Sequence, residues 1–214
     1  MNTIRLRITF AALHERGMSL VEVVIAIALI GIVATASLGL YVSSMSAANT
    51  QQRQQVAITI ANQSMETVLA WSVAKNPTTT VSDLYTGRSE TAVRALWTAA
   101  TGVSGVAQTY PFWDPSATAS SVPVIDLTRP VEVGGVKYVA QTLIGKCFQT
   151  KDGGNCTAPS STYPYATPPN STPLFRVIVI VKWSASSMCG AGGCSYVAQT
   201  LIDPNTDLVW NMNG

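Results

Sequence analysis

The sequence predicts an α+β fold: a long N-terminal helix, transmembrane in its first half, packed on an antiparallel β-sheet head. Three observations predict it. Residues 23–42 contain no charged side chain and are long enough to span a bilayer as a helix. Apolar residues recur at helical spacing after residue 49 and stop before Asn76 and Pro77. Later segments alternate apolar and polar residues with the period of a strand.

The charge is concentrated at the N-terminus. Arg5, Arg7 and Arg16 outnumber Glu15, so residues 1–17 have a net charge of +2, and the whole chain is also +2. Residues 18–214 are therefore formally neutral. A head with no net positive charge and no basic run lacks the electrostatic footprint of a nucleic-acid binder. The positive-inside rule places residues 1–17 in the cytoplasm and the head outside.

One helix is predicted from about Met18 to Ala74. Its second half has an apolar face, from which Gln63, Glu66 and Thr67 are excluded. The residues that share this face are Ala57, Ile60, Ala61, Ser64, Val68 and Trp71. We therefore divide the chain into an N-terminal segment (1–17), an apolar helix (18–48), its amphipathic continuation (49–76) and a globular β-rich head (77–214).

The head contains two clear strand signals. Residues 131–138 place Gly134 and Gly135 between β-rich arms, which predicts a hairpin. Residues 174–183 form the strongest strand pattern, with Arg176 and Lys182 on one face. The residues of its other face are all apolar: Phe175, Val177, Val179, Val181 and Trp183.

Other segments of the head carry weaker signals. The sequence YVAQTLI occurs twice, at 138–144 and 196–202. We interpret the repeat as two strands in similar sheet environments, because two short units do not make a repeat architecture. A short helix is expected at 89–97 and a last short strand at 207–212.

The four cysteines are interpreted as disulfide partners. Cys147, Cys156, Cys189 and Cys194 are an even number in a chain with an export signal. Their spacings differ from the CxxC pairs of zinc sites, so we expect no metal site. Four cysteines allow three connectivities. We predict the local pairs Cys147–Cys156 and Cys189–Cys194, of which the second would close a hairpin end between the strand ending at Trp183 and one beginning near Ser195.

The residues for common enzyme chemistry are missing. The single histidine, His14, lies in the N-terminal segment, and no GxSxG, P-loop, HExxH or GxGxxG motif occurs. We therefore predict that the chain is not an enzyme and binds no cofactor.

The most informative stretch runs from Gly17 through Met18 to Glu22 and continues as VVIAIALIGIVATASLGLY. It resembles the N-terminal processing signal of type IV prepilins and type II secretion pseudopilins. The resemblance implies a pilin fold and a leader, residues 1–17, that a prepilin peptidase removes after Gly17. It also implies methylation of the new N-terminus at Met18, with Glu22 as the fifth mature residue and a participant in filament assembly.

Details of the sequence resemble a minor pilin of the pilus-modification type. Met18 occupies the position where phenylalanine is usual, and Gly39 the position where many major pilins have proline. The implied function is a structural subunit of a type IV pilus or related filament. Its implied partners are the prepilin peptidase, other pilin subunits and the inner-membrane assembly platform. It would cross the inner membrane once before entering an extracellular filament. A type II secretion or competence pseudopilin is the alternative within this class.

Two interpretations of another class remain. Ala34, Thr35 and Ala36 match the A-x-A pattern of an ordinary secretory signal, which would release a soluble binding protein beginning at Ser37. A plain single-pass surface protein would keep Met1. Neither explains Glu22, because a carboxylate inside an apolar helix is costly unless it has a partner or a function.

Overall fold

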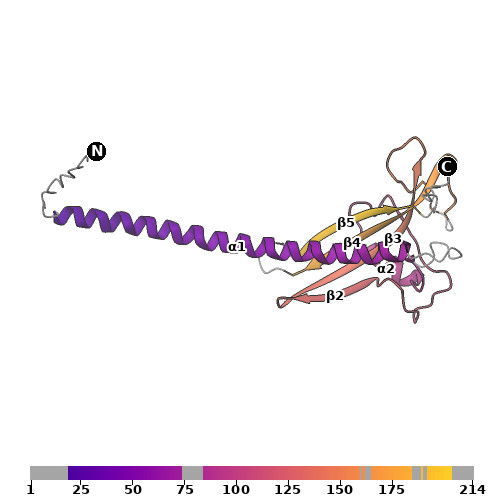
Figure 1. The fold of residues 1–214 in the computed structure, drawn as a ribbon, viewed down its shortest axis with the longest axis horizontal. Helices are drawn as coiled ribbons and strands as arrows, with labels where there is room; N and C mark the ends of the chain where they lie inside the picture. The colour runs from indigo at the N-terminus through magenta and orange to yellow at the C-terminus, as the bar shows by residue number, and fades with distance from the viewer. Residues whose placement is uncertain are drawn as a thin grey trace, which may run out of the picture. The chain divides into compact units, whose positions relative to one another are not determined.

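The computed structural model of the chain describes residues 19–73, 84–159, 161, 165–184, 189 and 192–203. The chain divides into two compact units, Met1–Asn49 and Thr50–Gly214, and each is described by itself. Its elements, labelled in Figure 1, are α1 (Leu20–Val73), α2 (Glu90–Ala99), β1 (Tyr110–Pro111), β2 (Thr128–Val133), β3 (Val136–Thr150), β4 (Ser171–Trp183) and β5 (Cys194–Ile202).

The predicted N-terminal helix is confirmed as α1. It runs from Leu20 to Val73, while Met18 and Ala74 lie outside the described residues. The polar stretch at 49–55 does not interrupt it, because this stretch contains neither proline nor glycine. Only residues 50–73 of α1 belong to the second unit.

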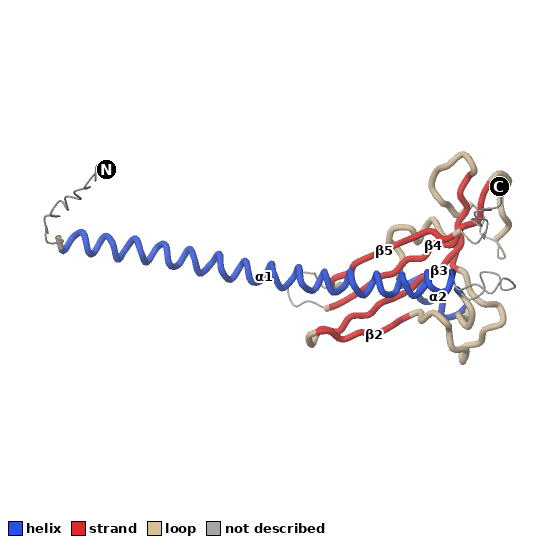
Figure 2. Tube along the Cα trace, in the orientation of Figure 1, coloured by secondary structure: helices blue, strands red, loops and turns tan. Residues whose placement is uncertain are grey.

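The second unit is built on a five-stranded antiparallel sheet (Figure 2). The strand order is β1-β3-β4-β5, and β2 also pairs with β3. The predicted hairpin is confirmed between β2 and β3, where Val133 is paired with Val136. Gly134 and Gly135 form its turn with φ values of 57° and 75°, a region that favours glycine. β4 pairs with β3 along its full length, from Trp183 opposite Tyr138 to Ser171 opposite Thr150.

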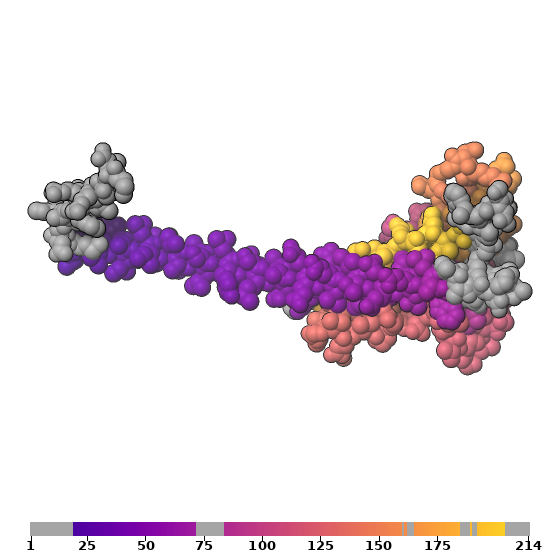
Figure 3. Space-filling view, viewed as in Figure 1, coloured from indigo at the N-terminus to yellow at the C-terminus, as the bar shows by residue number. Residues whose placement is uncertain are grey.

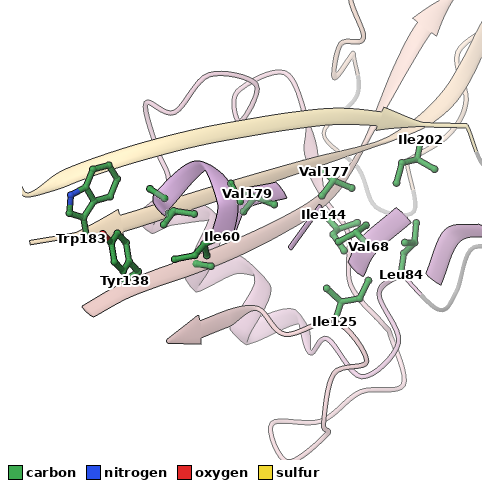
Figure 4. Close-up of a cluster of buried hydrophobic side chains, with 14 of the residues drawn as sticks. Ile60, Val68, Leu84, Ile125, Tyr138, Ile144, Val177, Val179, Trp183 and Ile202 are labelled. Atoms are coloured by element: carbon green, nitrogen blue, oxygen red, sulfur yellow. The ribbon is translucent and has the colours of Figure 1, made fainter. Parts of the chain in front are cut away.

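One face of the sheet is covered by the second half of α1. Figure 4 shows Ile60 and Val68 among the sheet residues Ile144, Val177 and Val179. The predicted apolar face of β4 is confirmed, because its members are all buried in this cluster: Phe175, Val177, Val179, Val181 and Trp183.

Trp71 departs from the prediction for α1. The predicted helix face is buried at Ala57, Ile60, Ala61, Ser64 and Val68. Trp71 shares this face by spacing but is 43% exposed. It lies in the last turn of α1. Helical spacing identifies which residues share a face, but it does not show where along the helix the packing against that face ends.

The opposite face of the sheet is covered by α2. This helix confirms the short helix expected at 89–97, and it begins directly after Ser89. Val93, Leu96 and Trp97 of α2 are buried together with Ile178 and Ile180 of β4. β4 is therefore buried on both faces, which explains its nearly continuous apolar run.

The two YVAQTLI segments flank β4 in the same orientation. Tyr138 of β3 is opposite Trp183, and Tyr196 of β5 is opposite Val181, so the segments are offset by two residues and present the same face. Tyr138 is buried in the apolar cluster between α1 and the sheet, and Tyr196 packs against this cluster. The two segments therefore share the predicted facing but differ in burial, since Leu143 of β3 is buried whereas its counterpart Leu201 of β5 is 43% exposed. The last strand expected at 207–212 lies outside the described residues.

Candidate functional site

The first half of α1 is an apolar surface. Every residue from Ser19 to Met45 is exposed, including Leu20 at 80%, Ile30 at 67% and Leu40 at 72%. Among the described residues, one helix, Leu20–Trp71, contains a stretch long and apolar enough to cross a membrane by length and composition. A helix that is apolar on all sides requires lipid or other protein around it.

Two hydroxyl groups near the middle of this surface are paired inside the helix. Thr35 Oγ1 donates to the carbonyl oxygens of Gly31 at 3.1 Å and Ile32 at 2.9 Å. Ser37 Oγ donates to Val33 O at 2.8 Å. Because these hydroxyls bond to carbonyls of the preceding turn, neither needs a partner from outside the helix.

Glu22 lies in the first turn of α1. Its backbone amide and that of Val23 donate to the carbonyl oxygen of Ser19 at 2.9 Å and 3.2 Å. A carboxylate at a helix N-terminus is favoured by the positive end of the helix dipole. The next charged residue along α1 is Arg53, so Glu22 is the single charge on the apolar half. Gly17 and Met18 lie outside the described residues.

Comparison with known families identifies this region. Residues 13–38 match the model of the prokaryotic N-terminal methylation motif. This is the prepilin-type signal of type IV pilins. The prepilin-type signal spans the end of the basic segment, Glu22 and the apolar half of α1 up to residue 38. The chain matches no curated protein and no solved structure.

The prepilin-type signal and the fold are both like those of type IV pilins. A long N-terminal helix followed by a five-stranded antiparallel sheet is a pilin-like α+β architecture. The signal supports a pilin or pseudopilin subunit, and it implies processing by a prepilin peptidase and assembly with other pilins. The family that carries this motif is structural rather than enzymatic. The apolar helix is consistent with membrane anchoring.

The structure places each cysteine next to the partner that was predicted for it. The Cα atoms of Cys147 and Cys156 are 5.4 Å apart, and those of Cys189 and Cys194 are 4.9 Å apart. Both pairs are joined as disulfides. The first is buried against Leu174.

Arg176 ties the chain around the first disulfide to the loop that follows α2. Its guanidinium donates to Cys156 O at 2.9 Å and to Gly105 O at 3.0 Å. A second bond of 3.0 Å reaches Thr109 Oγ1. Burial lowers the pKa of Arg176. This cluster joins two loops and β4, so we assign it a structural role.

Arg88 is a buried cation that the sequence did not reveal. It is 1% exposed, and its guanidinium donates to Ile125 O at 3.3 Å and to Thr142 O. Burial lowers its pKa to about 10, and nearby Asp126 acts in the opposite direction. Its bonds reach residues 37 and 54 positions away, so no local sequence signal identifies them. Arg88 therefore joins the segment before α2 to β3 and to the loop before β2.

Two hollows in the described part of the head contain no recognisable catalytic set. One, of about 380 Å³, lies between Arg94 and Trp97 of α2 and Val106, and another, of about 190 Å³, lies beside Asp126 and Arg129. Within the described ranges, no group of three or more His, Cys, Asp or Glu side chains could hold a metal ion.

Proposed function

We propose that this chain is a minor pilin of the pilus-modification type, a structural subunit of a type IV pilus or related filament. The main support is the methylation motif at 13–38, which continues into a helix exposed at every residue from Ser19 to Met45. Such a surface is stable in lipid, and it is equally suited to packing against other apolar helices.

The proposal includes a defined processing step. A prepilin peptidase cuts between Gly17 and Met18 and methylates the new amino group of Met18. Because Arg5, Arg7 and Arg16 precede the apolar run, residues 1–17 lie in the cytoplasm and the head outside before cleavage. The subunit then leaves the inner membrane through the assembly platform and enters the filament.

The N-terminal residue of the mature protein tests this step. The protein is purified from membranes and from the soluble and secreted fractions, and its N-terminus in each is determined by sequencing and by mass spectrometry. We expect Met18 with one added methyl group. Ser37 would indicate an ordinary signal peptide and Met1 an uncleaved anchor, and either result would contradict the proposal.

Glu22 is assigned to assembly and not to insertion. In the membrane it lies near the cytoplasmic interface, where a charge should cost less than the ~2.5–3.5 kcal/mol found at the centre of a spanning helix. In a filament core the carboxylate needs a positive partner. The methylated amino group of Met18, on its own or a neighbouring subunit, is the nearest candidate in sequence. A buried pair of this kind specifies register more reliably than it adds stability.

Variants of Glu22 separate assembly from insertion. We expect Glu22→Ala to insert and to be cleaved but to enter filaments poorly, with Glu22→Asp intermediate. Glu66→Ala is the control, because Glu66 is an exposed glutamate in the head half of α1. Processed subunit is measured in membranes and in sheared filaments. Wild-type amounts of Glu22→Ala in filaments would refute the assigned role.

The same fractions distinguish a pilus subunit from a type II secretion or competence pseudopilin. A minor pilin is recovered with pili sheared from the cell surface. A processed chain that remains entirely in the cell envelope, in cells that display pili, would contradict the minor-pilin assignment.

A further inference from the structure

The larger of the two hollows in the head lies between α2 and the loop that follows this helix. Its volume of about 380 Å³ is within the roughly 300–1,000 Å³ of small-molecule sites, and its lining residues all belong to the described part of the chain. Figure 3 shows the second half of α1, in purple, on the near side of the head, whereas α2 covers the opposite face of the sheet. The hollow is lined by no residue of α1, so it is independent of the prepilin-type signal.

Part of the lining of this hollow is polar. Arg94, Thr98 and Thr101 follow one another at spacings of four and three residues, which place them along one side of α2 and of the turn after it. The hydroxyl of Thr98 donates to Arg94 O at 2.9 Å, and that of Thr101 donates to Thr98 O at 2.8 Å. Because each hydroxyl already donates its hydrogen, its oxygen can accept a hydrogen bond from a ligand.

Arg94 is held in position by the head itself. Its Nε donates to Glu90 Oε1 at 2.7 Å, and its guanidinium carbon lies 4.7 Å from the ring centroid of Trp113. This bond uses Nε, so the two terminal nitrogens can donate to a ligand. A side chain that is already ordered loses less freedom on binding. Because Glu90 balances the charge of Arg94, the polar part of the lining has no net charge.

The rest of the lining is mainly apolar. It includes Trp97, Val106, Ala107 and Pro111. Trp97 and Val106 are buried in the apolar cluster between α2 and the sheet, and close packing holds such side chains in one position. The hollow therefore combines neutral hydrogen-bonding groups with a rigid apolar surface, and both are in place in the folded head.

We propose that this hollow binds a neutral saccharide. A sugar ring has hydroxyl groups around its rim and C–H groups on its faces. The hydroxyls can donate to Thr98 and Thr101 and accept from Arg94, while a C–H face packs against the apolar lining. A purely apolar ligand would take the polar groups away from water without replacing their hydrogen bonds, and an anion would meet the charge of Glu90 beside that of Arg94. The site belongs to the head, so the proposal does not depend on whether the chain enters a filament.

Titration with simple sugars tests the proposal. The full processed chain, with isotope-labelled tryptophan, is held in micelles of a detergent that has no sugar headgroup. The indole N–H resonance of Trp97 is followed by NMR as D-glucose, D-galactose, D-mannose or N-acetyl-D-glucosamine is added. We expect at least one of these sugars to shift the Trp97 resonance to saturation, while that of Trp71, which lies outside the hollow, stays in place. No saturable shift of Trp97 with any of them, or an equal shift of Trp71, would overturn the proposal.

Two further ligands test the chemical class. Sorbitol has the hydroxyl groups of a sugar but no ring, so it presents no C–H face and must be ordered on binding. We expect it to bind about tenfold more weakly than the best sugar. Inorganic phosphate should cause no saturable shift of Trp97. Sorbitol that binds as tightly as every sugar, or phosphate that binds more tightly than all of them, would show that the hollow does not recognise a saccharide ring.

A matched pair of charge substitutions tests the role of Arg94. Arg94→Gln removes the guanidinium donors, and we expect it to lower the affinity for the best sugar by about tenfold or more, because hydrogen bonds from charged groups are among the stronger ones. Lys137→Gln removes the same charge from an exposed position outside the hollow and should bind as the wild type does. Equal affinities of the two variants would contradict binding at Arg94.

A second pair of variants tests the hollow by filling it. Ala107 is an exposed residue of the lining, so Ala107→Leu occupies the hollow without enlarging a buried side chain. Ala119→Leu makes the same enlargement at an exposed loop position elsewhere. We expect Ala107→Leu to abolish the saturable shift and Ala119→Leu to retain it, with both proteins melting near the wild type. Sugar binding that survives Ala107→Leu unchanged would place the ligand elsewhere and overturn the proposal.

Discussion

Gly145 lies where β1 pairs with β3, and the substitution Gly145→Ala tests the packing on the α2 side of the sheet. Gly145 is paired with Pro111 and is buried. A methyl group at this position would collide with the backbone carbonyl of Tyr110 and would also press on Thr109 and the ring of Trp97. The side chains can move, but the carbonyl is fixed by the pairing of β1 with β3.

The expected loss of stability follows from this contact. Overpacking a well-packed core costs about 1–3 kcal/mol, and a clash with backbone favours the upper part of that range. For a domain of this size, each kcal/mol lowers the melting temperature by about 2–4 °C. We therefore expect Gly145→Ala to melt about 4–12 °C below the wild type.

The assay is thermal unfolding of the full chain in detergent, followed by tryptophan fluorescence. Trp97 and Trp113 report on this region because both are buried in the apolar cluster between α2 and the sheet. Gly192→Ala is the control, because a Cβ there meets nothing within 4 Å. It isolates the chain-entropy effect of replacing glycine, about 0.4–1 kcal/mol in the stabilising direction. A Gly145→Ala protein that melts with the wild type would refute the described packing of β1.

Three further predictions concern the head and the anchor. Arg88→Ala should lower the free energy of unfolding by about 2–4 kcal/mol in chemical denaturation, because two buried carbonyls lose their donor and a cavity remains. The exposed Arg94→Ala should cost about 0.5 kcal/mol or less, so an equal loss in both would contradict the role of Arg88. Replacing both Cys147 and Cys156 by serine should lower the free energy of unfolding by about 2–3 kcal/mol, because the short loop that they close is no longer constrained. A reducing agent should lower the melting temperature of the wild type more than that of this variant. Thr35→Val should leave the amount of membrane-inserted protein unchanged, because the Thr35 hydroxyl donates to carbonyl oxygens of its own helix. A clear fall in the amount of the variant recovered in the membrane fraction would contradict this prediction.

The parts of the fold that follow from neighbouring residues could be predicted. The charge-free run and the helical spacing predicted α1, and the Gly134-Gly135 signal predicted the β2–β3 hairpin, because both depend on residues close in sequence. The processing segment was recognised for the same reason: Glu22 and the basic residues before it form one contiguous pattern. The assignments of Gly17, Met18 and Glu22 remain predictions that the N-terminal and filament assays test.

Features that depend on distant contacts could not be predicted. Strand periodicity identified one apolar face of β4, but the burial of Ile178 and Ile180 depends on α2, which is far away in sequence. Arg88 would be expected at the surface from its charge, and its buried position is explained only by carbonyls supplied from two later segments. Trp71 was placed on the buried face because its spacing fits, although the end of α1 leaves it 43% exposed.

The internal hydrogen bonds of Thr35 and Ser37 have a consequence for how the apolar half of α1 changes surroundings. Neither hydroxyl has to exchange a partner when the helix passes from lipid to a bundle of like helices, because both already donate to the preceding turn. The charged cost of such a transfer falls on one carboxylate, because Glu22 is the single charged residue in this half of the helix. Moving the segment between lipid and such a bundle would therefore change the polar solvation of Thr35 and Ser37 little, in either direction.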